Sequence, residues 1–140
     1  MGSFTKHATN PDRRGLMLRV IYALCLAGAT FNHFRAIAQH GLFWDRGGLP
    51  WMSNTFWLSL AVLDPIAIVL LFAWPNLGVA MTAAIISVDV IHNLWITAVY
   101  FPPLFDQLRH APQLQEQIAF LIFVGATAPF AWRQTAKGND

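Results

Sequence analysis

The chain has 140 residues, of which 56% are hydrophobic and only 11% are charged. Soluble domains carry roughly 25% charged residues, so water is not the main solvent of this chain. The abundance of apolar and aromatic residues excludes a disordered protein, and the length fits a single domain over residues 1–140. The one cysteine, Cys25, excludes an intrachain disulfide and a cysteine-based metal site.

Four apolar segments follow one another along the chain, each close to the ~20 residues that cross a hydrocarbon core of about 30 Å. The ten-residue alternation of a membrane β-barrel is absent from these runs. The sequence therefore predicts an all-α integral membrane protein, a bundle of four transmembrane helices. We expect these helices at about 16–38, 54–74, 77–100 and 114–133.

The segments between the predicted helices differ in length. A polar, glycine-rich outer loop covers residues 39–53, and Ser53 and Asn54 are suited to cap the second helix. Pro75 and the asparagine after it predict a very short turn, which makes the second and third helices an antiparallel hairpin. Two consecutive prolines end the third helix, and a second outer loop covers residues 101–113.

The basic residues predict the orientation, because cytoplasmic flanks of membrane helices are enriched in lysine and arginine. Each of the two long loops carries a single arginine that is balanced by an aspartate. We therefore expect both termini to be cytoplasmic and both loops to lie outside, with a bacterial inner membrane as the location. The sequence has no basic stripe of the kind that binds nucleic acid, so we expect no nucleic acid partner. The basic residues that flank the four spans are Lys6, Arg13, Arg14, Arg19, Arg133 and Lys137.

Two carboxyl groups lie within the predicted spans. Asp64 is about ten residues into the second helix and Asp89 about twelve into the third, so a rise of ~1.5 Å per residue brings both to the middle of the bilayer. An ionisable side chain at that depth costs about 2.5–3.5 kcal/mol on insertion scales, and such residues mark functional sites by default.

Other polar and aromatic residues are predicted to lie near these carboxyls. Asp89, His92 and Asn93 share one face of the third helix, because residues three and four apart are neighbours. Trp57 shares a face with Asp64 in the same way. If the faces converge, the bundle encloses a pocket with the two carboxyls at its base. The residues expected to bind a substrate there are His33, Asn93, Trp57, Trp95, Thr127 and Tyr22.

Two close carboxyls in a low dielectric cannot both ionise cheaply, and a histidine can move protons near neutral pH. We therefore predict a pocket for a hydrophobic small molecule or lipid, and an isomerase or cyclase in which Asp64, Asp89 and His92 transfer protons. The acids and histidine in the central helices resemble the layout of the four-helix sterol isomerase and sigma-2 receptor family, with no specific motif that aligns.

Three other functions are compatible with the same residues. The polar side chains could be interhelical contacts in a non-catalytic subunit of a membrane complex, and Asp64 could serve the kink at Pro65. Intramembrane carboxyls also suit a proton-coupled transporter. Haem or metal binding would rest on His33 and His92 alone, so we expect neither a metal nor a cofactor. The sequence leaves open a homo-oligomer or a larger membrane complex.

Overall fold

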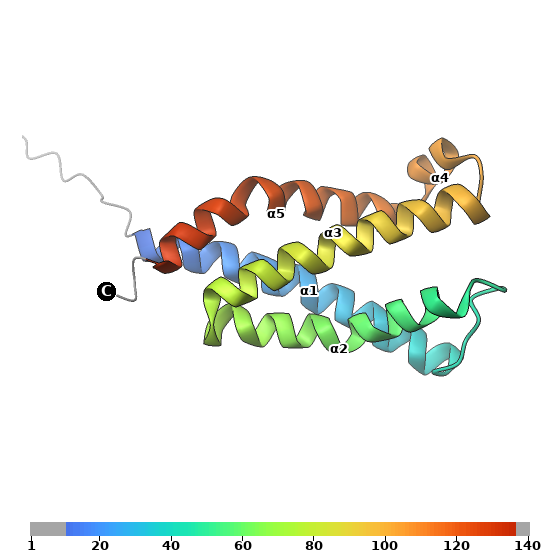
Figure 1. Cartoon of the computed structure of the whole chain (residues 1–140), viewed down its shortest axis with the longest axis horizontal. Helices are drawn as coiled ribbons and strands as arrows, with labels where there is room; N and C mark the ends of the chain where they lie inside the picture. Colours follow the sequence, from blue (N-terminus) through green and yellow to red (C-terminus); the bar gives the residue numbers. More distant parts are fainter. Residues whose placement is uncertain (1–10, 137–140) are drawn as a thin grey trace, which may run out of the picture.

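The computed structural model describes residues 11–136 and contains, within them, helices joined by short connections (Figure 1). Four of these helices are long and apolar enough to cross a membrane, which confirms the predicted all-helical bundle with four spans. The fifth, α4, is a short helix between the last two spans. The helices are α1 (Pro11–His40), α2 (Trp51–Ala73), α3 (Pro75–Tyr100), α4 (Leu104–His110) and α5 (Pro112–Ala136).

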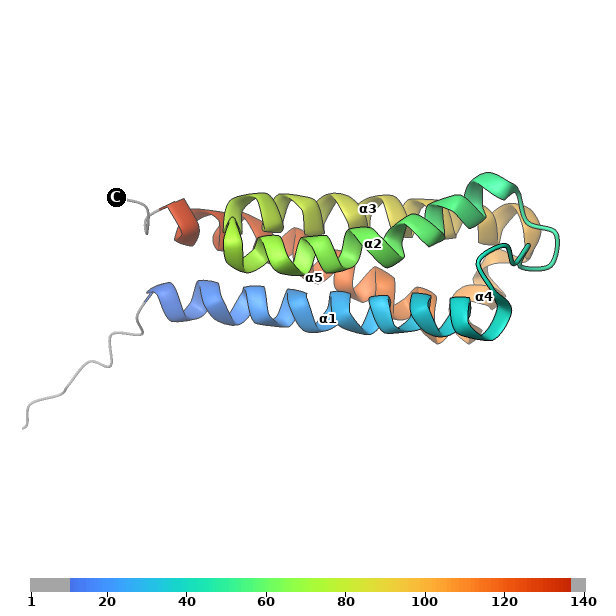
Figure 2. The ribbon, with the colours of Figure 1, turned by 90° about the horizontal axis from the view of Figure 1, so that it is seen from below.

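The four long helices alternate in direction and form a ring of contacts from α1 to α2, α3, α5 and back to α1. Of the two diagonal pairs, α1 and α3 scarcely touch, and α2 and α5 share no close backbone contact in the described residues. Figures 1 and 2 show the start of α1, the α2–α3 turn and the end of α5 together at one end of the bundle, which we call the terminal end. The segment 41–50 and α4 lie at the opposite end, which we call the loop end.

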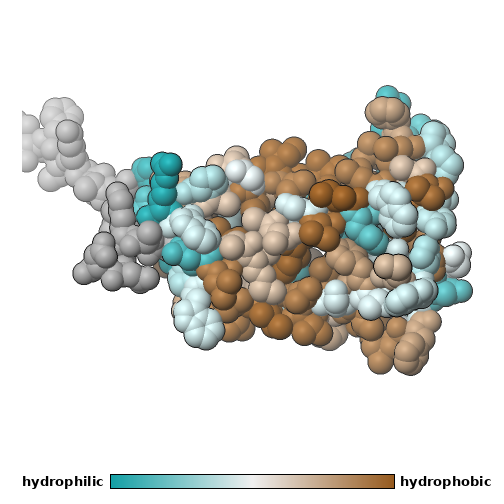
Figure 3. Space-filling view, in the orientation of Figure 1, coloured by the Kyte–Doolittle hydropathy of each residue, from teal (hydrophilic) through white to brown (hydrophobic). Residues whose placement is uncertain are grey.

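The exterior of the bundle is apolar and several of its polar side chains are inside. Leu24, Ile91 and Ile122, from three different helices, are each 67% exposed. Figure 3 shows hydrophobic residues over much of the middle of one face. Asp64 and Asp89, by contrast, are buried. This distribution suits a surrounding of lipid, because a bundle in water would place its charged groups outside.

The packed core lies toward the terminal end and is mainly aliphatic. Tyr22 of α1 is its largest member and is completely buried, with the rings of Phe120 and Phe123 of α5 edge-on to it at centroid distances of 6.2 and 5.8 Å. Such edge-to-face pairs are favourable beyond the area that they bury. Because α1 and α5 are far apart in sequence, this cluster joins the first and last spans.

The α2–α3 turn is tighter than the sequence predicted. Trp74 alone separates the two helices, whereas the prediction placed the turn at Pro75 and the residue after it. Proline is favoured in the first turn of a helix, where its missing N–H is not needed, and Pro75 begins α3. A Cβ atom on Gly78 would lie 2.3 Å from the backbone nitrogen of Leu71, so only glycine allows the helices to approach so closely.

Two further predictions about connections are wrong. Ser53 does not cap α2, because α2 begins at Trp51 with Pro50 as the capping residue and without a side-chain cap. The segment 101–113 is not wholly a loop, since it contains α4. The end of α4 is held by Gln115, whose Nε2 donates to two carbonyl groups of that helix at 2.7 and 3.0 Å.

Four of the predicted flanking arginines lie at the terminal end, as their positions in α1 and α5 require, whereas Arg35, Arg46 and Arg109 lie toward the loop end. Arg13, Arg14 and Arg133 are exposed there, and Arg19 donates from Nη1 to the carbonyl of Leu71 at 3.2 Å. Cationic side chains are favourable beside the free carbonyls at the end of a helix such as α2. The predicted flanking residues Lys6 and Lys137 lie outside the described residues.

Candidate functional site

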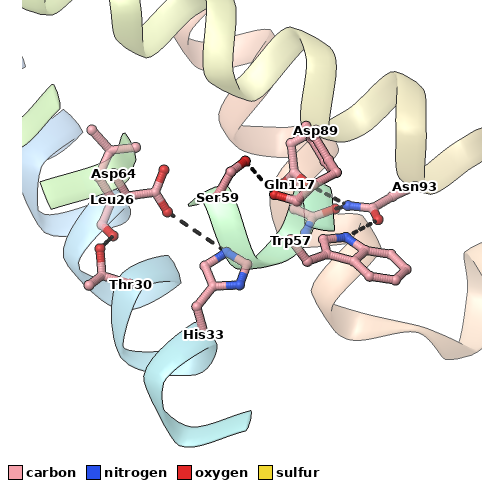
Figure 4. A network of polar contacts seen from close by, with 10 residues as sticks. Leu26, Thr30, His33, Trp57, Ser59, Asp64, Asp89, Asn93 and Gln117 are labelled. Atoms are coloured by element: carbon pink, nitrogen blue, oxygen red, sulfur yellow. Dashed lines mark hydrogen bonds and ion pairs between the residues drawn. The ribbon is translucent and has the colours of Figure 1, made fainter. Parts of the chain in front are cut away.

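Asp89, Asn93, Gln117 and Trp57 form one hydrogen-bonded group that joins α2, α3 and α5 (Figure 4). The Nε1 of Trp57 donates to Oδ1 of Asn93 at 2.9 Å. The Nδ2 of Asn93 donates to Oδ1 of Asp89 at 2.8 Å and to Oε1 of Gln117 at 2.9 Å. Asp89 is buried, with 8% of its surface exposed. It is joined to Trp57 and Gln117 through Asn93.

The orientation of both amides in this group follows from the indole. An indole N–H can only donate, so the side-chain atom of Asn93 that meets it must be the oxygen. The nitrogen of Asn93 must then face Asp89 and Gln117, and the atom of Gln117 that accepts from it must be Oε1. The Nε2 of Gln117 is left over, and it donates to no residue in the described part of the chain.

A hollow of about 250 Å³ lies beside this group at the loop end. Trp57, Asn93 and Gln117 line it, and we call these three residues the polar floor. Aliphatic and aromatic side chains from two helices and three connections form most of the rest. The other lining residues are Leu49, Ile96, Thr97, Phe101, Gln107, Ala111, Gln113 and Leu114.

Asp64 belongs to a different polar group. Its Oδ2 lies 3.8 Å from Nε2 of His33, which joins α2 to α1 (Figure 4). Asp64 is only 2% exposed, and no described residue provides a hydrogen bond to its Oδ1. No hydrogen bond or ion pair among the described residues joins Asp64 to Asp89, so the two predicted carboxyls lie in separate groups, and neither lines the hollow.

His92 belongs to a third polar group, which joins α3 to α2. Its Nε2 lies 3.0 Å from the Oγ of Ser53, and its Nδ1 is buried without a partner among the described residues. The rings of Phe56, Trp57 and Trp95 surround the imidazole at centroid distances of 4.4, 5.1 and 6.1 Å. His92 is therefore held in an aromatic setting and does not line the hollow.

Two other predicted binding residues lie elsewhere. The hydroxyl groups of Tyr22 and Thr127 are 2.6 Å apart and join α1 to α5 within the packed core. Thr127 also donates to the carbonyl of Phe123 in the turn before it. These two residues contribute to packing between the first and last spans, and neither faces the hollow.

The connection between α1 and α2 folds over the loop end. The guanidinium of Arg46 lies 4.6 Å from the ring centroid of Trp57 and 4.8 Å from that of Trp44, and burial there lowers its pKa. Trp44 stacks on His40 at 3.8 Å. Arg46 and its neighbours Gly47 and Gly48 all have positive φ, a conformation that glycine adopts without strain. Trp57 thus contacts the α1–α2 connection on its ring face and Asn93 through its N–H.

Gln117, Ser53 and Arg46 are residues of these groups that sequence reasoning missed. Gln117 follows Gln115 and Glu116 at the polar start of the fourth span, yet it lies three residues after Leu114 and seven before Val124, both of which are buried. That spacing puts it on the inward face of α5 and was the signal that could have identified it. For Arg46 the sequence carries no comparable signal, because its contacts depend on how the connection folds.

No group of three or more potential metal ligands occurs within residues 11–136. Comparison of the chain with models of protein families, with curated proteins and with solved structures gives no match. The functional inference therefore rests on the geometry of the site alone.

Proposed function

We propose that this protein is a multi-pass membrane protein whose hollow at the loop end binds a hydrophobic small molecule. The observation that carries the proposal is the combination of a hollow of about 250 Å³, mostly apolar sides and a polar floor of fixed orientation. Binding sites for small molecules have this composition, with apolar walls and a few placed polar groups. The basic flanks and the paired ends at the terminal end support a bacterial inner membrane with both termini cytoplasmic.

The proposal is tested by what copurifies with the protein. Native mass spectrometry of protein extracted from its membrane should show a bound small molecule. Ala111 lines the hollow, so Ala111→Phe should fill it and release that molecule without removing a hydrogen bond. Ala98→Phe is the matched control, because Ala98 is exposed on α3 and does not line the hollow. An empty wild-type protein, or equal occupancy in Ala111→Phe, would contradict ligand binding.

We further propose that the bound molecule undergoes proton transfer, as in an isomerase or cyclase. Asp89 supports this, because its carboxyl accepts a hydrogen bond from Asn93 of the polar floor. Asp64 with His33, and His92, provide further ionisable groups within the spans. Proton abstraction and return should exchange hydrogen with solvent. Incubation in D₂O should therefore raise the mass of the copurified molecule, and Asp89→Asn should prevent this while leaving the molecule bound.

The catalytic proposal is checked with a control variant and would be contradicted by one pattern of deuterium uptake. His110→Gln changes an exposed histidine in α4 and should not alter deuterium uptake. Equal uptake in wild type, Asp89→Asn and protein-free vesicles would contradict catalysis but leave binding intact.

A non-catalytic subunit of a membrane complex is the second candidate. The group of Trp57, Asn93 and Gln117 joins three helices, and such bonds hold membrane helices together without any chemistry. Two results together would favour this function over ligand binding. The hollow would be empty in protein purified alone, and another membrane protein would copurify stably with this chain.

A further inference from the structure

The hollow carries no charged residue in its lining. Its polar members are the side chains of one tryptophan, one threonine, one asparagine and three glutamines. Asp89 is separated from it by Asn93, whose Nδ2 already donates to the carboxyl. A ligand with a formal charge would lose its hydration on entering this space and gain no opposite charge beside it, which is strongly unfavourable.

The hydrogen-bond donors of the polar floor are nearly all taken. Asn93 accepts through Oδ1 and donates twice through Nδ2, so it has no N–H left for a ligand. Trp57 has one N–H, and Asn93 takes it. The donor that remains at the floor is the Nε2 of Gln117, whose oxygen is directed toward Asn93. The floor therefore offers a ligand an N–H donor.

The size of the hollow limits how much of a ligand it holds. A cavity of about 150 Å³ takes a benzene molecule, so a hollow of about 250 Å³ takes on the order of ten non-hydrogen atoms by the same scale. A longer chain would have to extend out of the hollow along its apolar side. Leu49, Ile96, Phe101 and Leu114 provide that side.

We propose that the ligand is an uncharged molecule of about ten or more non-hydrogen atoms that places a carbonyl oxygen against the Nε2 of Gln117. The inference rests on the proposed binding function and adds the chemical class of the ligand, a neutral hydrogen-bond acceptor with an apolar body. This assignment follows from the juxtaposition of a lining without charged residues and the amide of Gln117, whose oxygen accepts from Asn93 and whose nitrogen is left for a ligand.

A matched set of ten-carbon probes tests this inference on the full chain in lipid nanodiscs. The probes are decan-2-one, decan-2-amine, decanoic acid and decane at pH 7, measured by equilibrium dialysis against nanodiscs that contain the filled variant Ala111→Phe. This reference removes simple partition into lipid. We expect decan-2-one to bind at least about tenfold more tightly than the amine, the acid or the alkane.

Variants of glutamine test the contact itself. Gln117→Leu removes the donor and should weaken decan-2-one about tenfold, to the level of decane. Gln39→Leu makes the same change at an exposed position near the end of α1, away from the hollow, and should change nothing. The comparison of probes between the wild type and Ala111→Phe needs no glutamine variant and therefore decides the question even if Gln117→Leu does not fold.

The outcomes separate this inference from the proposed function. Binding of the amine or the acid as tight as that of the ketone, or full ketone affinity in Gln117→Leu, would overturn the carbonyl assignment while ligand binding stands. If none of the four probes binds above the filled reference, both the inference and the binding function fail.

Discussion

Trp57 is the residue on which the orientation of the polar floor depends. Its N–H fixes Asn93, and Asn93 in turn fixes Gln117. Removing that one donor leaves the Oδ1 of Asn93 without its partner. A buried acceptor that loses its donor costs about 1–3 kcal/mol in soluble proteins, and bonds between membrane helices average about 0.6 kcal/mol.

We therefore predict that Trp57→Phe lowers the free energy of unfolding by about 1 kcal/mol. The phenyl ring still offers an aromatic face to the guanidinium of Arg46, so the loss of stability should come mainly from the missing N–H. The measurement is unfolding in mixed micelles titrated with a denaturing detergent. Trp95→Phe is the control, because Trp95 is 51% exposed and its N–H donates to none of the described residues. Equal stability of both variants would show that the indole N–H contributes nothing.

At the scale of the helices, Gly78 allows a close contact between α2 and α3, whereas two other glycines in the spans make no such contact. Gly78 faces the backbone of Leu70 and Leu71 in α2 without space for a side chain. Gly28 and Gly125 look equally suited to close helix contacts in the sequence, yet nothing lies within 4 Å of a Cβ atom placed on either. Small residues favour close approach, but they do not show which faces meet.

Gly78→Ala should destabilise the α2–α3 hairpin by about 3 kcal/mol or more. The new methyl group would meet backbone atoms at 2.3 and 2.5 Å, so no side-chain rotation can relieve the overlap and the helices must separate. Gly28→Ala and Gly125→Ala should instead be neutral or stabilise by up to about 1 kcal/mol, because alanine favours helix. Thermal unfolding in detergent compares the three variants. A Gly78→Ala protein as stable as the other two would refute the close contact.

The length and polarity of the four spans could be predicted because they are properties of contiguous sequence. The pairing of side chains could not. A membrane helix is apolar around most of its circumference, as Val62 and Ile91 show by facing outward, so its rotation leaves little trace in the sequence. The pairing of Asp64 with His33 rather than with Asp89 depends on that rotation. The seven-residue α4 was missed because its residues show no long apolar pattern.

For the whole molecule, the arrangement of the ends gives a test of orientation. The first and last described residues share the terminal end, and Phe43, 98% exposed, is at the loop end. In a Cys25→Ser background, Phe43→Cys should react with a membrane-impermeant maleimide added outside intact cells. Gly138→Cys should react only after the cells are made permeable. The opposite labelling pattern would reverse the proposed orientation.

The α2–α3 pair has a wedge geometry that follows from the size of the side chains along it. At one end Gly78 places nothing between the helices, and toward the other end the rings of Trp57 and His92 lie between them and bond across to the opposite helix. Figure 1 shows the two helices spreading apart in that direction. Two aromatic rings therefore occupy the space where the wedge opens beside the hollow. We expect truncation of the His92 ring, which does not line the hollow, to let the two helices approach each other without changing a lining residue.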